Sequence, residues 1–441
     1  MKNLSLYLSA SFLVLSLASP VRAADLQGRV DDLEATVDAL RAEIADLRKQ
    51  PEFTPSPNFK SSKGDYAFKI RGQIAGDVAV FDNREGPTDF NDGTQLRRAR
   101  LGVDGTINTD WAYRLEIDVG NASRDDNTGQ EIDVKDAYIQ YKGIDKTTIT
   151  VGQHKTPNTL QQAYSSSDTL FAELPLFVEA FTNRTTAGGD YKAGASAKYS
   201  DVNWTATAGI FGENYSSNGG TAPNTYRDEG WGPASRLTWA PVNGIDKTLH
   251  LGVSGYWRDT GGRTTGGNSG VRFRSTPEVS VDSTRLVDTG NIAAKSYAFE
   301  GVELAGQYGP VYVESEYGRT QVNRANASNV DFDGAYVAAS YVLTGENRAY
   351  KDGTFSRIKP ANPFSLKGDG TGAWEVATRY STIDLNDGTL LGGSEDNYSA
   401  ALNWYPNDYT RVMFNYVRFD AERAGVNSEG DALLSRVAVV W

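Results

Sequence analysis

The sequence contains no cysteine and only two histidines, His154 and His250. The lack of cysteine excludes disulfides, thiolate metal sites and a cysteine nucleophile. Neither histidine belongs to a His-x-x-His or His-Glu-x-x-His pattern, and no Gly-x-Ser-x-Gly stretch indicates a hydrolase. We therefore predict no catalytic residue, no metal site and no cofactor.

Long apolar runs are also lacking once the first residues are set aside. Met1–Ala23 has a charged start at Lys2, an apolar core at Leu4–Ala18 and a small-x-small end at Val21-Arg22-Ala23. This pattern predicts a cleaved signal peptide over residues 1–23 and an exported protein. No later run reaches the roughly 18 apolar residues of a membrane-spanning helix.

An excess of positive charge is the third feature that the sequence lacks. The formal charge is -12, and removal of residues 1–23, which hold Lys2, Arg22 and no acid, takes it to -14. A general nucleic-acid partner is excluded, because such proteins carry a net basic footprint.

One segment has a strong helical pattern. Apolar residues in Asp25–Gln50 are spaced alternately by four and three, which is a coiled-coil heptad. They are Leu26, Val30, Leu33, Val37, Leu40, Ile44 and Leu47. We predict a coiled-coil oligomerisation segment over residues 24–50 and a proline-containing linker over residues 51–65. The residue types at the heptad positions favour a two-stranded coiled coil, although a larger assembled body could impose another symmetry. The alternative is a solvated helical linker.

Strand-length segments of alternating polarity fill the rest of the chain. In Gln95–Val119, apolar Leu101 and Val103 alternate with Arg100 and Asp104, and the pattern resumes after a turn at Asn108–Asp110. Sixteen such segments over residues 66–441 predict an all-β, 16-stranded antiparallel transmembrane barrel. Short connections should lie at one rim, and long ones, including Thr156–Arg184, Asp259–Ala298 and Thr344–Thr371, at the other.

Several sequence blocks resemble the phosphate-selective porin O and P family. They are RRARLGVDGTI (Arg97–Ile107), Trp111–Asp118, DAYIQY (Asp136–Tyr141), VGQHKTP (Val151–Pro157), GVRFRSTPE (Gly270–Glu278), TRLVDTG (Thr284–Gly290), Gly372–Gly388 and ALNWYPN (Ala401–Asn407). The C-terminal strand ending in Trp441 resembles the sorting signal of outer-membrane barrels. The resemblance implies a homotrimeric outer-membrane channel embedded in lipid, with a periplasmic coil that would then be three-stranded.

Basic residues on the polar face of the strands should point into the lumen, because arginine facing lipid at mid-depth costs about 2–4 kcal/mol. By this parity, the inward cations are Lys69, Arg71, Arg98, Arg100, Arg114, Arg236, Arg258, Arg379 and Arg436. We expect the loop Thr156–Arg184 to fold into the pore and narrow it. The resemblance implies that Lys155 and the Arg97/Arg98 pair meet an anion there, and we add Arg100, Arg114 and Arg71 to this constriction.

A second basic set forms the expected funnel toward the constriction. The resemblance indicates a ladder at Arg272, Arg274 and Arg285, to which we add Arg258, whereas Thr276 and Val279 interrupt the basic row. Inward carboxylates could neutralise the cations or reverse the preference. They are Asp77, Asp104, Glu116, Asp118, Asp136, Glu314, Glu316 and Glu375.

The sequence therefore predicts a porin for passive diffusion of small anions, with phosphate or other oxyanions as candidates. The alternatives are a general non-specific porin, a structural tether that links the outer membrane to the envelope through the coil, and a soluble oligomeric β-protein.

Overall fold

A computed structural model of the chain describes residues 32–39, 56–61, 64–120, 132–182, 190–215, 229–261 and 270–441. The predicted signal peptide, residues 1–23, lies outside the described residues, as does most of the predicted coiled coil. Residues 32–39 form a helix in which Leu33 and Val37 are exposed. Within the described ranges, no helix is long and apolar enough to cross a bilayer. The coiled coil itself stays a prediction.

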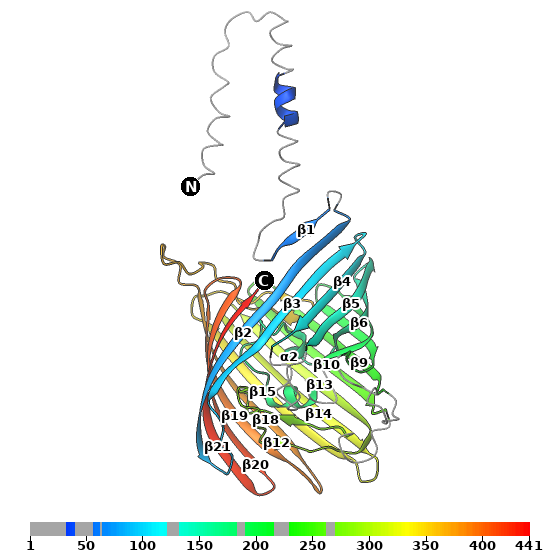
Figure 1. Cartoon of the computed structure of the whole chain (residues 1–441), viewed down its shortest axis with the longest axis vertical. Helices are drawn as coiled ribbons and strands as arrows, with labels where there is room; N and C mark the ends of the chain where they lie inside the picture. The colour runs from blue at the N-terminus through cyan, green and yellow to red at the C-terminus, as the bar shows by residue number, and fades with distance from the viewer. Residues whose placement is uncertain are drawn as a thin grey trace, which may run out of the picture.

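Sixteen antiparallel strands close into a barrel (Figure 1), which confirms the predicted barrel fold. They are β2 (Tyr66–Glu85), β3 (Gly93–Ile107), β4 (Trp111–Asp118), β5 (Asp133–Ile144), β6 (Thr147–Lys155), β7 (Tyr191–Ser200), β8 (Trp204–Phe211), β9 (Gly232–Asn243), β10 (Lys247–Asp259), β13 (Ala294–Tyr308), β14 (Val311–Arg324), β15 (Val330–Val342), β18 (Ala373–Asp387), β19 (Leu390–Tyr405), β20 (Thr410–Arg423) and β21 (Val426–Val440). The last strand pairs with the first, from Gln73 opposite Val440 to Glu85 opposite Glu429.

A short strand, β1 (Asn58–Lys60), continues the sheet where β21 ends. It pairs with β2 from Asn58 opposite Lys69 to Lys60 opposite Ala67, within the predicted linker. Next to it, the backbones of Gly72 and Trp441 exchange two hydrogen bonds of 3.0 and 3.1 Å. Both edges of β2 are therefore satisfied, and the barrel has no open seam at this point.

The alternation of polarity sorts side chains between the outer face and the lumen. Leu101 and Leu115 are more than half exposed on the outside, whereas Glu116 and Asp118, at alternate positions of β4, are buried on the inside. Among the irregularities that break the strict period, two bulges bear on the lumen. Arg97 is an extra residue between Leu96 and Arg98 opposite Gly76 and Ala75, and Lys135 is extra between Val134 and Asp136. A bulge gives two consecutive residues to one face, which parity by itself does not predict.

The connections between strands differ from the expectation at one position. Residues 343–372, between β15 and β18, lie at the rim that carries the short turns such as Asn108–Asp110 and the C-terminus (Figure 1). The prediction that Thr344–Thr371 belongs to the long-loop rim is wrong. Strand direction alternates, so every second connection returns to the same rim, and this one does so despite its length.

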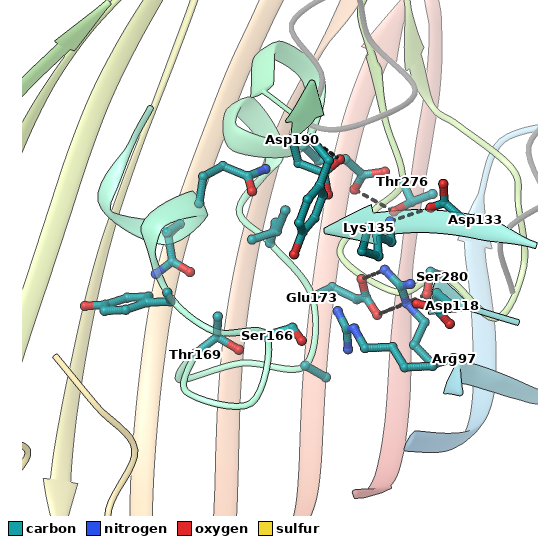
Figure 2. A pocket seen from close by; sticks show the side chains of 18 of the residues that line it. Arg97, Asp118, Asp133, Lys135, Ser166, Thr169, Glu173, Asp190, Thr276 and Ser280 are labelled. Atoms are coloured by element: carbon teal, nitrogen blue, oxygen red, sulfur yellow. Dashed lines mark hydrogen bonds and ion pairs between the residues drawn. The ribbon is translucent and has the colours of Figure 1, made fainter. Parts of the chain in front are cut away.

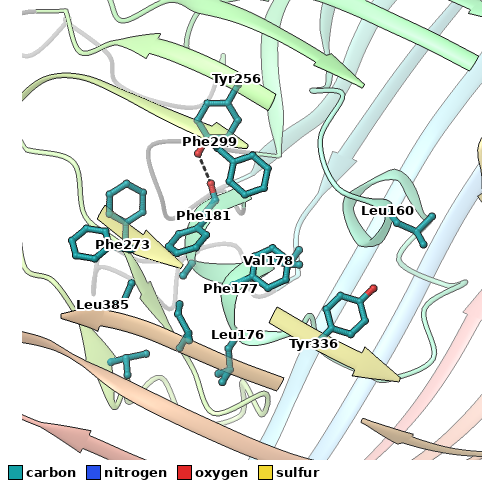
Figure 3. Packing of buried hydrophobic residues seen from close by; sticks show 14 of the residues in the cluster. Leu160, Leu176, Phe177, Val178, Phe181, Tyr256, Phe273, Phe299, Tyr336 and Leu385 are labelled. Carbon is teal, nitrogen blue, oxygen red and sulfur yellow. Dashed lines mark hydrogen bonds between the residues drawn. The ribbon is translucent and has the colours of Figure 1, made fainter. Parts of the chain in front are cut away.

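Among the described parts of the connections, three fold into the lumen. Helix α2 (Leu160–Ala163) and helix α3 (Leu176–Thr182) belong to the first, β11 (Arg274–Ser275) and β12 (Val287–Asp288) to the second, and β16 (Tyr350–Lys351) and β17 (Thr354–Phe355) to the third. Phe177 and Phe181 of α3 are fully buried against aromatic rings of the wall, including Tyr336 and Phe299 (Figure 3). This packing fixes α3 against the wall.

Candidate constriction site

The loop that begins at Thr156 crosses the lumen and is tied to the opposite wall. Glu316 on β14 accepts hydrogen bonds from the backbone amides of Leu160 and Gln161, at 2.7 and 3.0 Å. Farther along, the amide of Ala172 donates to Asn415 on β20 at 2.8 Å. The expected inward fold of the loop is thus present over its described part, residues 156–182.

A cavity of about 160 Å³ lies where this loop faces β3, β5 and β6. Figure 2 shows the charged and hydroxyl side chains that converge on it. Four of the six predicted constriction residues line the cavity: Arg97, Arg98, Arg100 and Lys155. Arg285 from the expected funnel lines it too.

Two of these arginines are bound to carboxylates. The guanidinium of Arg97 donates to both carboxylate oxygens of Glu173, each at 2.8 Å, and Arg100 donates to Asp118 at 2.8 Å. Burial would raise the pKa of the Glu173 carboxyl, but the positive charges of Arg97 and Arg436 outweigh it and hold that pKa well below its usual range. Glu173 is therefore ionised, and its negative charge offsets much of the positive charge of Arg97.

Arg98 differs from its neighbours because no carboxylate of the described residues forms an ion pair with it. Its side chain is buried, and its Nε and Nη1 atoms find no hydrogen-bond partner within the described part of the chain. The charges of Arg97, Arg436 and Arg100 act on it from nearby. A buried cation among cations, with unused donors, is a position that an anion would stabilise.

Lys155 also lacks a carboxylate within ion-pair distance among the described residues. Its ammonium donates to the carbonyls of Gln162 and Tyr164 at 2.9 and 2.7 Å and lies 5.7 Å from the ring centre of Tyr191. These carbonyl acceptors orient the ammonium without neutralising its charge. Arg98 and Lys155 thus bring to one cavity two cations without a directly bonded carboxylate among the described residues, while Glu173 acts on Arg98 and Asp190 acts on Lys155 from farther away.

Arg71 and Arg114 lie in an adjoining cavity of about 320 Å³, which Arg100 and Lys155 also line. Arg71 forms an ion pair with Glu116 at 3.0 Å, and Arg114 forms one with Asp104 at 2.6 Å. Both predicted residues therefore reach the lumen near the constriction, with their charges largely balanced.

The expected ladder divides into three situations. Arg272 donates from Nε and Nη2 to both carboxylate oxygens of Asp288, and Arg274 is buried. Arg285 donates to the carbonyl of Ser283 at 3.1 Å and borders the cavity. Arg258 is buried and bonds the carbonyls of Phe211, Gly212 and Gly230, so it braces loop backbone instead of facing the cavity.

Sequence reasoning missed other residues of the site. Lys135 lines the cavity because of the bulge in β5, and it pairs with Asp133 at 2.7 Å. Tyr191, Ser166 and Ser280 add an aromatic face and hydroxyl groups. The sequence signal for Lys135 was its position next to the inward Asp136 in a strand. Strict alternation would place these two neighbours on opposite faces, so the signal pointed away from the lumen.

A wider space of about 900 Å³ continues from Lys155 toward the short-turn rim. Its lining holds one acid, Asp352, and several cations and hydroxyl residues. The cations are Arg114, Lys142, Lys146, Lys155, Lys198, Arg236 and Lys351. The third inward connection contributes Lys351 to this space, which no feature of the sequence indicated.

Comparisons with known proteins agree with this architecture. The family model of phosphate-selective porin O and P matches residues 68–441. An uncharacterized protein of Caulobacter vibrioides is 31% identical over 386 residues, covering 85% of this chain and 73% of that protein. Porin O of Pseudomonas aeruginosa is 24% identical over 408 residues, covering 86% of this chain and 89% of that protein.

Solved porin structures share the fold. The anion-selective porin from Comamonas acidovorans superposes with a TM-score of 0.54 at 12% identity, covering 85% of this chain and all of that chain. OmpT of Vibrio cholerae, in its trimer form, superposes with a TM-score of 0.51 at 12% identity, covering 85% of this chain and 99% of that chain. With sixteen strands, an inward loop and a family match over the whole barrel, the chain belongs to the phosphate-selective porin O and P family of outer-membrane channels, which are not enzymes.

Proposed function

We propose that this porin conducts small anions by passive diffusion and favours phosphate or related oxyanions at the constriction. The observation that carries the proposal is the pair formed by Arg98 and Lys155, two cations that line one cavity and have no carboxylate of the described residues within ion-pair distance. A solute that enters can therefore contact these two cations without first displacing an acid from them.

The chemistry of the two groups suits an oxyanion. A guanidinium offers parallel N–H donors that match two oxygens of a phosphate, and an ammonium adds a compact charge. Low-dielectric walls strengthen both interactions relative to water. Ser166 and Ser280 supply hydroxyl groups at the same cavity.

The paired arginines have a secondary part in the proposal. Arg97 and Arg100 shape the cavity and lend it partial charge, while Arg71 and Arg114 continue the basic wall on the periplasmic side. Arg272, Arg274 and Arg285 would guide anions from outside. Arg258 enters only as a brace, because its two terminal nitrogens are engaged by backbone carbonyls and by Glu213.

We further propose a homotrimer that is exported by a cleaved signal peptide at residues 1–23. Residues 24–50 would form a three-stranded coil in the periplasm, joined to the barrel by residues 51–65. OmpT of Vibrio cholerae has been solved as a trimer, which supports the assembly proposed here.

A planar bilayer under a KCl gradient tests the selectivity. We expect a reversal potential on the chloride side and block of the chloride current by added phosphate. Arg98→Gln and Lys155→Gln should each weaken the block about tenfold or more, the loss of one charge-assisted hydrogen bond. Arg319→Gln is the matched control, because this arginine is paired with Asp331 at 2.9 Å outside the lumen.

Other outcomes decide against the proposal. A chloride-side potential without phosphate block would leave a general anion-permeable porin. A potential on the potassium side would mean that the inward carboxylates dominate, and anion selectivity would be abandoned.

A further inference from the structure

The connection between β15 and β18 lies at the rim of the short turns, which is the periplasmic rim in outer-membrane barrels. Its two halves go in opposite directions. The first enters the lumen, where Arg348 pairs with Glu375 and Phe355 packs against Tyr312 with ring centres 4.8 Å apart. The second half, residues 362–372, turns outward and projects beside the wall, at the rim where the C-terminus lies (Figure 1). We call residues 362–372 the periplasmic hook.

Backbone hydrogen bonds close the hook at its base. The amide of Gly372 donates to Asn362 at 3.0 Å, and the amide of Ser365 donates to Gly370 at 3.1 Å. The amide of Phe364 donates to Pro406 in the next periplasmic turn at 2.7 Å. A Cβ atom at Gly370 would lie 1.9 Å from the carbonyl oxygen of Pro363, so the tight closure requires glycine. The base thus presents the tip in a fixed position.

The tip that this base presents is apolar. Leu366 is 92% exposed and Phe364 is 44% exposed. Phe364 meets the ring of Trp404 edge-on at 5.2 Å, and Trp404 stacks on Trp374 at 5.5 Å. An ordered loop that holds a leucine almost entirely outside the protein is unfavourable in water and favourable in an apolar environment.

The hook is continuous with a belt of outward aromatic residues at the periplasmic ends of the strands. The belt comprises Trp111, Tyr141, Tyr199, Trp204, Trp239, Tyr308, Tyr341, Trp374, Trp404 and Tyr409. Such belts mark the level of the membrane–water interface. Through Trp404, Phe364 is placed at this level. Exposed Lys359 and Lys367 flank the apolar tip, as expected beside lipid phosphates.

We propose that the hook is an interfacial anchor in which Phe364 and Leu366 enter the periplasmic leaflet of the outer membrane and Lys367 meets phospholipid headgroups. The occupant of this surface is a phospholipid leaflet, because the apolar tip, the aromatic belt and the lysines follow the polarity profile of one. The anchor does not depend on which ions the channel selects.

The absence of cysteine from the chain makes a direct test available. Leu366→Cys is labelled with the fluorophore NBD and reconstituted, as the full-length protein, into vesicles of phosphatidylethanolamine and phosphatidylglycerol. We expect blue-shifted emission and at least a twofold loss of intensity when the acyl chains carry bromine. Asp369→Cys in the same hook is the matched control and should keep the emission and iodide accessibility of a label in water.

Two outcomes would overturn the anchor. If the label at position 366 is quenched by aqueous iodide and not by bromolipid, the tip lies in the periplasm. If its emission is blue-shifted in detergent and vesicles alike without bromolipid quenching, a second copy of the chain covers the tip. Both substitutions are at exposed loop positions, so neither is expected to prevent folding.

Discussion

Many basic side chains that reach the lumen end on a carboxylate, whereas Arg98 and Lys155 at the constriction cavity have none within ion-pair distance among the described residues. Arg436 meets Asp77, Arg236 meets Glu303 and Arg114 meets Asp104. Such pairs hold wall and loop together, but their fields cancel within a few ångströms. Because salt screens what remains beyond about 8–10 Å, selectivity depends on single residues at the narrowest point and not on the total charge.

Glu173→Gln should make the channel more anion-selective. The substitution removes the partner of Arg97, while Arg436 keeps Asp77. We expect the reversal potential under a KCl gradient to move farther toward chloride. Breaking a buried pair also costs about 3–5 kcal/mol, so the variant should unfold at lower denaturant concentration. A shift toward potassium would contradict this account of Arg97.

The same ion pair predicts how selectivity responds to pH. Burial raises the pKa of the Glu173 carboxyl, but the positive charges of Arg97 and Arg436 lower it by more. The pKa of Glu173 therefore lies well below the usual value of 4.5. A carboxyl with a depressed pKa gives stability that is complete above its unfolded pKa and is lost only as pH falls through its folded pKa. The reversal potential should therefore stay unchanged between pH 7 and pH 5. A change in reversal potential with its midpoint near pH 4.5 or above would contradict the ion pair between Glu173 and Arg97.

At the scale of elements, short pieces of irregular chain depend on the wall for their position. Helix α2 has only four residues, too few to be stable in isolation. Its first amides are satisfied by Glu316 of β14, and Thr159 caps it by accepting a hydrogen bond from the amide of Gln162. The strand wall therefore sets the depth to which the loop enters the pore.

Glu316→Gln should loosen this loop without opening the barrel. A carboxamide has one acceptor oxygen where the carboxylate has two, so one of the amides of Leu160 and Gln161 loses its partner, at a cost of about 1–3 kcal/mol. We expect larger open-channel current noise in single-channel recordings, with sixteen-stranded folding retained. Glu300→Gln, at an exposed position, is the control and should leave the noise unchanged. Equal noise in both variants would show that Glu316 does not hold the loop.

At the scale of the whole molecule, closure of the sheet separates the barrel from the N-terminal segment. The ring is complete from β2 to β21, and β1 continues the edge of β2 beyond Trp441. Every barrel strand thus has two neighbours without any contribution from residues 24–50. The channel should therefore form independently of the coil.

Deletion of residues 25–50 should keep the conductance per channel and lower the temperature at which trimers dissociate on gels. A coil adds interface area and local concentration to the trimer but no lumen residue. Complete loss of envelope attachment with unchanged trimer stability would favour the tether. If trimer stability and envelope attachment both stay unchanged, residues 25–50 neither stabilise the trimer nor act as a tether.

The sequence by itself determined the class of fold. Period-two alternation is a local property, and sixteen repeats of it, with a polar face too charged for lipid, leave a membrane barrel as the fold. Parity likewise assigned Arg98, Arg100 and Arg114 to the lumen, since the side of a strand on which a residue lies follows from counting neighbours.

Only the tertiary structure decided which of those cations remain available. Arg97 finds Glu173 at a separation of 76 residues, and Arg436 finds Asp77 at 359, so no local pattern could pair them. The bulges that add Arg97 and Lys135 to the lumen, and the rim to which residues 343–372 return, are set by strand register around the closed ring. Register depends on all sixteen strands at once. It decides that Arg98 and Lys155 lie at the constriction without a carboxylate of the described residues within ion-pair distance.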